Sequence, residues 1–319
     1  MTNLPVLITA YNRPNTLLSL LRRIDKLERR DIWISVDQAN KPSDANLETL
    51  KIASDWQKNS IHKVHIVERS RNLGIYEHLP TALSEFFAIF ERGIVLEDDI
   101  EILPEFVEFL DSSPGWLDWE KYWSVCSHNP LSTCNPYSER VTTVVFRPSN
   151  FHSIWGWATS KINAIKFIEN YDNSLTNQHI REVLIETSRS ISRDPFLRTA
   201  FINTWMRKMI GWKDRRKFSG WDTRWVFEAW KESKQSLLPD KSLGREEIIQ
   251  LEGQTHPHQS SGVLWESKTK NDFSFTLGKM QAQLEVKRLS VWGITRPYAW
   301  AYNSRISRQL KEMSHDHSS

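Results

Sequence analysis

The first hundred residues alternate between short apolar runs and longer segments with helical periodicity, and this alternation constrains the fold most strongly. Apolar runs at 5–10, 32–37, 64–67 and 94–96 are typical of buried strands. Between them, residues 16–27, 46–57 and 78–90 carry apolar side chains at helical spacing. Consecutive parallel strands need helical crossovers. The pattern therefore predicts an α/β fold, a three-layer α/β/α sandwich with a mainly parallel central sheet.

The regular alternation ends near Pro104. Beyond it, the sequence predicts a short helix at 106–110, a strand at 122–126, a β-rich run at 141–146 and helices at 164–171, 180–187 and 194–210. We expect residues 1–105 and 106–285 to form two halves of one domain. Residues 286–319 are then a basic and aromatic C-terminal extension.

The composition is that of a soluble globular protein, with 39% hydrophobic and 25% charged residues among 319. A net charge of +3 is too small to predict nucleic-acid binding. Cys126 and Cys134 form neither a metal-ligand spacing nor a disulfide framework, which fits a reducing cytoplasm. No apolar run approaches the ~18 residues of a membrane span, and Met1–Pro5 does not open a signal peptide. We therefore expect a cytoplasmic protein.

Three adjacent acids, Glu97, Asp98 and Asp99, follow the apolar run at 94–96 directly. An unpaired carboxylate costs several kcal/mol to bury, and ligands of α/β sheets bind where strands end. Hard oxygen atoms suit Mg²⁺ or Mn²⁺ held jointly with substrate phosphates. A solvated acidic loop is the alternative, but apolar residues on both sides favour a metal site.

Two more charged residues follow predicted strands at the same edge of the sheet. Arg13 has the planar guanidinium that clamps phosphate oxygens, although it could be a surface turn residue. Asp37 ends the second strand, where it could instead cap the next helix. The sequence has no GxGxxG and no GxxxxGK[ST] motif, so dinucleotide-binding and P-loop proteins lose their main support.

Together, Leu4–Pro14, Val36-Asp37 and Glu97-Asp98-Asp99 resemble the nucleotide-sugar glycosyltransferases of the GT-A fold. More narrowly, the chain is similar to the inverting N-acetylglucosaminyltransferases of N-glycans and O-mannose glycans, and to related bacterial sugar transferases. The resemblance extends from Leu4 to about residue 262. It implies a nucleotide-diphosphate sugar donor (most readily a UDP-sugar), Mn²⁺ or Mg²⁺, and a glycan or glycolipid acceptor.

The resemblance also implies roles for individual residues. Asp99 matches the direct metal ligand, Asp98 a residue near the ribose or a metal-bound water, and Glu97 the residue nearest the sugar hydroxyls. Arg13 matches the arginine that contacts the donor phosphates, and Asp37 the acid that reads the uracil edge.

Further nucleotide-sugar contacts are implied for five residues: Ala10, Tyr11, His78, Trp157 and His256. Tyr11-Asn12 departs from the Cys-Asp that animal enzymes tend to carry. His78 could equally be an exposed histidine at the start of a helix. Trp157 lies in a segment that resembles the opening of the acceptor half, and could instead be a core aromatic beside a tight turn. His256 precedes a small, polar stretch suited to a lid, but could be an ordinary loop histidine.

The segment Gly220–Trp225 resembles the Trp-Asp segment that carries the catalytic base. An inverting transfer needs a carboxylate within hydrogen-bond reach of the acceptor hydroxyl, to take its proton. We assign this role to Asp222, for which a buried capping aspartate is the alternative.

The basic residues of 208–217 and of 286–313 suit an anionic acceptor and an anionic lipid surface. Peripheral contact with the inner face of the cell membrane is therefore an expectation for the C-terminal extension. Two other functions remain open. A nucleotidyltransferase acting on a sugar phosphate would normally carry a glycine-rich basic loop after its first strand, and Ala10–Pro14 has no glycine. A non-catalytic glycan-binding protein could share the fold.

Overall fold

The computed structural model describes residues 3–113, 117–129, 144–172, 174–214 and 220–246. The predicted lid with His256, the extension at 286–319 and Cys134 lie outside the described residues. No helix within the described ranges is long and apolar enough to cross a membrane.

The N-terminal half consists of four strands connected by three helices, as the alternation of the sequence predicts. Each of the three helices begins two to four residues earlier than predicted. The elements are β1 (Val6–Ala10), α1 (Pro14–Ile24), β2 (Asp31–Val36), α2 (Asp44–Asn59), β3 (Lys63–Glu68), α3 (Gly74–Ile89) and β4 (Arg92–Glu97).

The chain after β4 is less regular. It contains β5 (Ile100–Ile102), α4 (Pro104–Asp111), β6 (Tyr122–Cys126), β7 (Phe146–Ser149), β8 (Trp157–Ser160), α5 (Lys161–Tyr171), α6 (Asn177–Ile191), α7 (Pro195–Lys213), α8 (Trp221–Lys231), β9 (Gln235–Pro239) and β10 (Gly244–Glu246). Of the β-rich run predicted at 141–146, residues 141–143 lie outside the described ranges, 144 and 145 are not in a strand, and Phe146 begins β7.

The main sheet has eight strands in the order β3-β2-β1-β4-β8-β6-β9-β7. β1 pairs in parallel with β2 and with β4, so that Val6 lies between Ile32 and Ile94. β8 is antiparallel to both of its neighbours, β4 and β6, and β7 is antiparallel to β9. The sheet is therefore mixed but mainly parallel. A separate small sheet pairs β5 with β10.

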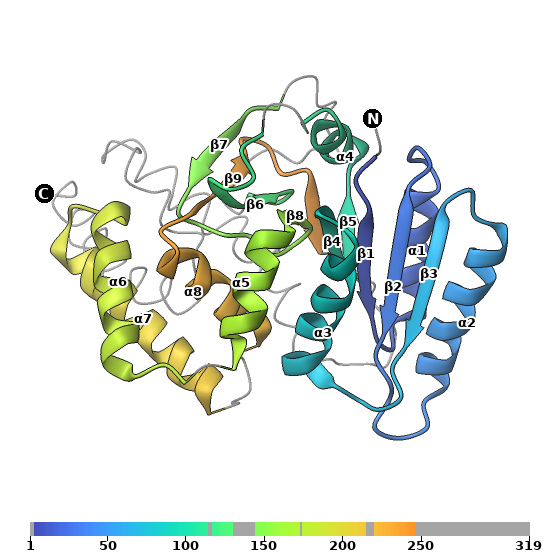
Figure 1. The fold of residues 1–319 in the computed structure, drawn as a ribbon, viewed down its shortest axis with the longest axis horizontal. Helices are drawn as coiled ribbons and strands as arrows, with labels where there is room; N and C mark the ends of the chain where they lie inside the picture. Colours follow the sequence, from blue (N-terminus) through green and yellow to red (C-terminus); the bar gives the residue numbers. More distant parts are fainter. Residues whose placement is uncertain (1–2, 114–116, 130–143, 173, 215–219, 247–319) are drawn as a thin grey trace, which may run out of the picture.

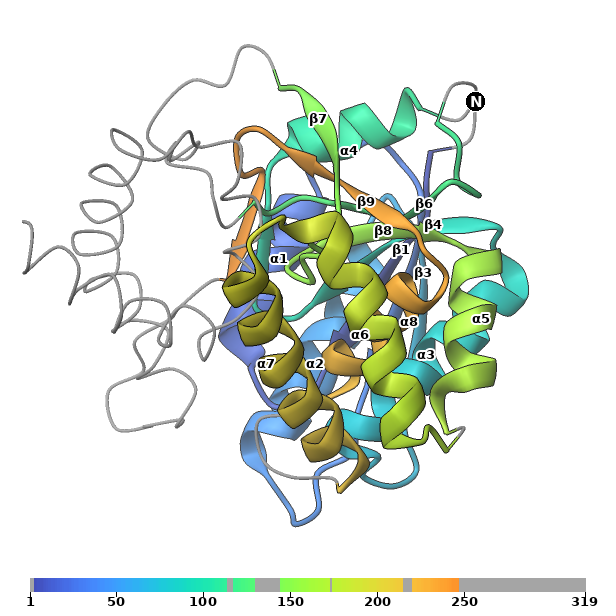
Figure 2. The ribbon, with the colours of Figure 1, turned by 90° about the vertical axis from the view of Figure 1, so that its left-hand side faces the viewer.

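Helices cover both faces of the main sheet (Figure 1), which confirms the predicted three-layer α/β/α class. Alternate residues of β1 enter the two cores: Val6 and Ile8 pack with α1 and α4, and Leu7 packs with α3, α5 and α8. All five residues of β1 are buried, as a strand between two helical layers requires. Figure 2 shows α6 and α7 in front of α8, on the side that faces away from β1, β2 and β3.

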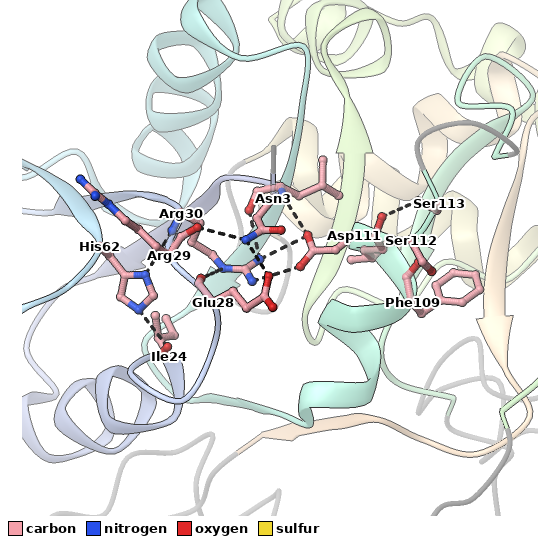
Figure 3. A network of polar contacts seen from close by, with 12 residues as sticks. Asn3, Ile24, Glu28, Arg29, Arg30, His62, Phe109, Asp111, Ser112 and Ser113 are labelled. Carbon is pink, nitrogen blue, oxygen red and sulfur yellow. Dashed lines mark hydrogen bonds and ion pairs between the residues drawn. The ribbon is translucent and has the colours of Figure 1, made fainter. Parts of the chain in front are cut away.

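A buried ion pair fastens the amino edge of the sheet, opposite the edge where β1 and β4 end (Figure 3). Arg30 Nη2 lies 3.0 Å from Asp111 Oδ2, at the end of α4, and Arg30 Nη1 donates to the Leu4 carbonyl at 3.3 Å. The Leu4 amide donates to Asp111 Oδ1 at 2.9 Å. The Arg30 side chain is 1% exposed. Arg30 therefore joins the segment before β1 to α4 at a position far from the predicted site.

Candidate functional site

The predicted acids lie where β4 ends beside β1. Glu97 is the last residue of β4 and is in register with Thr9. The Asp98 amide donates to the Thr9 carbonyl at 2.9 Å, and its Oδ2 accepts from the Tyr11 amide at 3.2 Å. Asp98 is 4% exposed. It therefore joins the ends of β1 and β4, and its carboxylate is fixed at the edge of the sheet.

Arg13 supplies the positive charge next to these acids. Its Nη1 lies 3.3 Å from Asp98 Oδ1 and forms a close ion pair with Asp99 Oδ2. The Asp99 side chain is 14% exposed, and that of Arg13 is 38% exposed. Arg13, which is predicted to bind donor phosphates, pairs with the two aspartates.

Burial and mutual repulsion make it costly for the three acids to be ionised together. Burial is the largest cause that raises the pKa of Glu97 to about 8, with Asp99 adding repulsion. Burial likewise raises the pKa of Asp98 to about 7, although Arg13 acts in the opposite direction. Hard oxygen atoms in a partly dehydrated, negatively charged cluster fit a divalent cation. Within the described residues, no group of three or more His, Cys, Asp or Glu side chains has the arrangement of a metal site. The binding of Mn²⁺ or Mg²⁺ at these acids therefore stays a prediction.

Asp222, the predicted catalytic base, comes from the other half of the chain. It lies in the first turn of α8, where its Oδ1 accepts from the Gly220 amide at 3.2 Å. This contact is the capping interaction that was the alternative to a catalytic role. Burial and Asp99 are the main causes of the raised pKa of Glu97, and the Asp222 charge adds a smaller contribution in the same direction. Burial lowers the pKa of Lys208 in α7, and the Asp222 carboxylate acts in the opposite direction. The Lys208 Nζ lies 5.0 Å from the centre of the Trp205 ring.

Aromatic rings hold the start of α8 against β8. Trp157 lies 4.3 Å from Trp225 and 6.2 Å from Trp221, between ring centres. Trp157 is only 1% exposed, so its ring is a core aromatic rather than a surface for a sugar. The adjacent Gly156 has φ of +73°, which provides the tight turn of the alternative prediction.

A buried charge network fixes the rest of α8. Arg224 and Glu228 are both 0% exposed, and Arg224 Nη2 lies 2.7 Å from Glu228 Oε1. Lys231 contacts Glu228 Oε2 at 3.0 Å, and the Arg224 guanidinium lies 5.0 Å from the centre of the Trp212 ring. Breaking a buried pair by removing one partner typically costs ~3–5 kcal/mol. This network therefore holds the helix that carries Asp222.

The Asp37 carboxylate accepts hydrogen bonds from backbone amides at the start of α3. Its Oδ1 accepts from the Leu73 amide and its Oδ2 from the Gly74 amide, both at 2.8 Å. The Gln38 amide also donates to Oδ1, at 3.0 Å, and Asp37 is 3% exposed. Asp37 thus caps a helix, as the alternative held, although the helix is α3 and not the next one in the chain. The predicted contact of Asp37 with the base of a nucleotide stays a prediction, which these hydrogen bonds do not test.

The predictions overlooked Asn46, which fastens the loops after β1 and β2 together. Its Nδ2 donates to the Tyr11 carbonyl at 2.5 Å and to the Asp37 carbonyl at 2.9 Å. Ala10 takes part through its backbone, since its carbonyl accepts from the Asp37 amide at 2.9 Å. Asn46 is 2% exposed. It follows α2's N-cap Ser43 and gives no sequence motif that distinguishes it from a surface helix residue.

His78 is buried in the second turn of α3, with 8% exposure, so the alternative of an exposed histidine is wrong. Its Nε2 lies 2.9 Å from the Ser35 hydroxyl of β2. The structure therefore brings Tyr11 and Arg13 together with Asp98 at the ends of β1 and β4. Ala10 of β1 and Asp37 after β2 are joined by a backbone hydrogen bond, and His78 of α3 contacts Ser35 of β2. The structure sets Trp157 apart in the core, and His256 lies outside the described residues.

No family model matches the sequence, and no curated protein matches it significantly. Among solved structures, the chain is similar to HddC from Yersinia pseudotuberculosis, with 14% identity and a TM-score of 0.30. The similarity covers 53% of this chain and 80% of HddC. A likeness this low carries no functional argument, so the geometry of the site has to support any assignment.

Proposed function

We propose that this chain is a GT-A type glycosyltransferase that moves a sugar from a nucleotide-diphosphate donor, most readily a UDP-sugar, to a hydroxyl of a glycan or glycolipid. One observation carries the proposal. At the carboxyl end of β4, beside β1, Arg13 pairs with both Asp98 and Asp99, and Glu97 lies directly before them in register with Thr9. A fold-stabilising role does not account for this arrangement, because the carboxylates repel one another.

The donor would bind at the carboxyl ends of β1, β2 and β4. Arg13 pairs with Asp98 and Asp99. A diphosphate would offer the guanidinium a second anion, and Asp99 would then become available to an ion shared with the phosphates. Bound Mn²⁺ or Mg²⁺ would supply positive charge against the leaving diphosphate. Glu97 would lie nearest the sugar.

The transfer itself would be a single displacement. The acceptor oxygen forms a bond to the anomeric carbon, and the bond from that carbon to the phosphate oxygen breaks. Asp222 takes the proton of the acceptor hydroxyl, and the nucleoside diphosphate leaves with the electron pair of the broken bond. The sugar is transferred with inversion, because attack and departure occur on opposite faces.

Three measurements test the proposal. Calorimetry with UDP, with and without Mn²⁺, should show metal-dependent binding that Asp99→Asn weakens. A panel of nucleotide sugars should then release nucleoside diphosphate slowly to water, and Asp222→Asn should retain UDP binding while losing this turnover. Asp55→Asn, at an exposed carboxylate on α2, is the matched control.

The other functions give different results. UDP binding without turnover on any donor would favour a glycan-binding protein, and release of pyrophosphate from a nucleoside triphosphate and a sugar phosphate would favour a nucleotidyltransferase. If Asp99→Asn retained full metal-dependent binding, the assignment of the metal ligand would be wrong.

A further inference from the structure

Behind the carboxyl end of β2, four side chains connect β2, α3 and the residue after β3. Arg69 donates to the Ser35 hydroxyl through Nε at 3.2 Å and through Nη2 at 2.9 Å. The same guanidinium contacts both carboxylate oxygens of Glu85, at 2.6 and 2.8 Å. His78 Nε2 lies 2.9 Å from the same Ser35 hydroxyl. Ser35 is fully buried, and Arg69 and His78 are each 8% exposed.

The hydrogen-bonding capacity of the Ser35 hydroxyl determines where the His78 proton lies. A serine hydroxyl has one proton and two lone pairs, and an arginine side chain is always protonated. Arg69 directs two N–H groups at the Ser35 oxygen and can only donate to it. The Ser35 proton is then available for His78 Nε2, which would act as the acceptor in this contact. This arrangement favours a neutral His78 with its ring proton on Nδ1.

The charges around His78 agree with a neutral ring. Burial is the largest effect and lowers the pKa of His78 to about 4, and Arg69 lowers it further. Asp37, Glu85 and the Ser35 backbone act in the opposite direction, and their combined effect is smaller. Near neutral pH the ring is therefore uncharged, and only one of its two nitrogens carries a proton.

We propose that Ser35 and Arg69 are positioning residues that hold His78 as the Nδ1–H tautomer, so that the ring offers a hydrogen-bond donor to an oxygen of the bound nucleotide. Among the described residues, Ser35 is the single side chain that hydrogen-bonds the His78 ring. Glu85 in turn fixes the Arg69 guanidinium by a bidentate contact. The role toward a nucleotide rests on the proposed function, whereas the tautomer does not.

The tautomer can be measured on the free protein. A long-range ¹H–¹⁵N spectrum at about pH 7 distinguishes protonated from unprotonated ring nitrogens, and the signals lost in His78→Gln identify this residue. We expect a neutral His78 with its proton on Nδ1, unchanged down to about pH 5. A proton on Nε2, or a ring that titrates near pH 6.5, would overturn the assignment.

Variants test the positioning role. Ser35→Ala removes the hydroxyl that faces Nε2, and Arg69→Lys removes the pair of N–H groups directed at that hydroxyl. Each should give a mixture of tautomers and weaken UDP binding in the presence of Mn²⁺ roughly three- to tenfold, the usual effect of one lost hydrogen bond. Ser35→Thr keeps a hydroxyl and should restore a single tautomer. Arg71→Lys is the control, because Arg71 is 68% exposed and contacts only Glu77 among the ion pairs found.

The two proposals fail in different ways. If the unaltered chain binds no UDP, the proposed function is wrong, and the spectrum of the free protein still decides the tautomer. If the unaltered chain binds UDP and Ser35→Ala binds it equally well, the positioning role is wrong. If Ser35→Ala does not fold, Arg69→Lys and the spectrum of the unaltered chain give the same decisions.

Discussion

Replacing Glu97 by Gln should stabilise the fold at alkaline pH and leave it nearly unchanged at acid pH. Burial raises the pKa of Glu97 from the ordinary 4.5 to about 8. Because the folded chain binds this proton more tightly than the unfolded chain, the stabilising linkage is complete below pH 4.5 and is lost as the pH rises through about 8. Above that pH, the folded chain carries the full cost of a buried carboxylate.

The size of the effect follows from the two pKa values. The interval from 4.5 to about 8 corresponds to an upper limit of roughly 5 kcal/mol, at about 1.4 kcal/mol per pH unit. Glu97 is half-buried, and its repulsion is shared with Asp98 and Asp99. We therefore expect Glu97→Gln to add on the order of 2 kcal/mol to the free energy of unfolding near pH 8.5, and close to zero near pH 4.5.

Urea unfolding followed by tryptophan fluorescence measures this difference, with EDTA present to remove divalent ions. Glu91→Gln is the matched control, because Glu91 precedes the same strand and its side chain is 78% exposed. The reasoning would be refuted if Glu97→Gln changed the free energy of unfolding equally at both pH values, or destabilised the fold at alkaline pH. A change in the slope against urea would point instead to an altered unfolded state.

Three other changes have defined outcomes. Asp222→Asn should lower kcat of sugar transfer by roughly 10²–10⁴ while the Kd for UDP stays within about twofold, measured by product formation and calorimetry. Arg30→Met should cost about 3–5 kcal/mol in urea unfolding, because it leaves Asp111 without its buried partner; a loss below about 0.5 kcal/mol would show that the pair is not structural. Gly156→Ala should lower the Tm measurably, since φ is +73° and a Cβ would lie 2.8 Å from Ser127 Oγ, whereas an unchanged Tm would mean that the turn relaxes at no cost.

The N-terminal half could be predicted because its signals are local. β1 is buried throughout, and most of β2 and β4 is buried, so a short apolar run suffices to mark them; β3, at the edge of the sheet, is only half-buried but keeps apolar residues at its centre. The start of α3 was misplaced because Gly74, at φ +66°, begins the helix only with the help of Asp37, which is distant in the sequence. The spacing of apolar residues near Gly74 cannot reveal a contact with a residue 37 positions earlier in the sequence.

The small sheet could not be predicted for the same reason. β5 and β10 are three residues each, and they pair positions 100–102 with 244–246. Strands this short have no periodicity of their own. Their pairing depends on the long return of the chain through α5 to α8, which no adjacent residues encode.

The carboxylates of the site were visible in the sequence, but their partners were not. Glu97, Asp98 and Asp99 follow a clear apolar run, and Asp222 lies in a recognisable tryptophan-rich segment. The pairing of Arg13 with the aspartates and the burial of Asn46 both depend on two strands ending side by side. Such contacts are properties of the assembled sheet edge.

The bonds made by Asn46 also determine how a ligand would be received. Since its amide already holds the loops after β1 and β2 together, those loops lose their conformational freedom when the chain folds and not when a ligand arrives. Binding at this edge should then show a small entropic penalty and a modest heat-capacity change, set by the surface of the ligand itself. Asn46→Ala would shift that ordering cost to the binding step, where calorimetry would register it as a less favourable entropy.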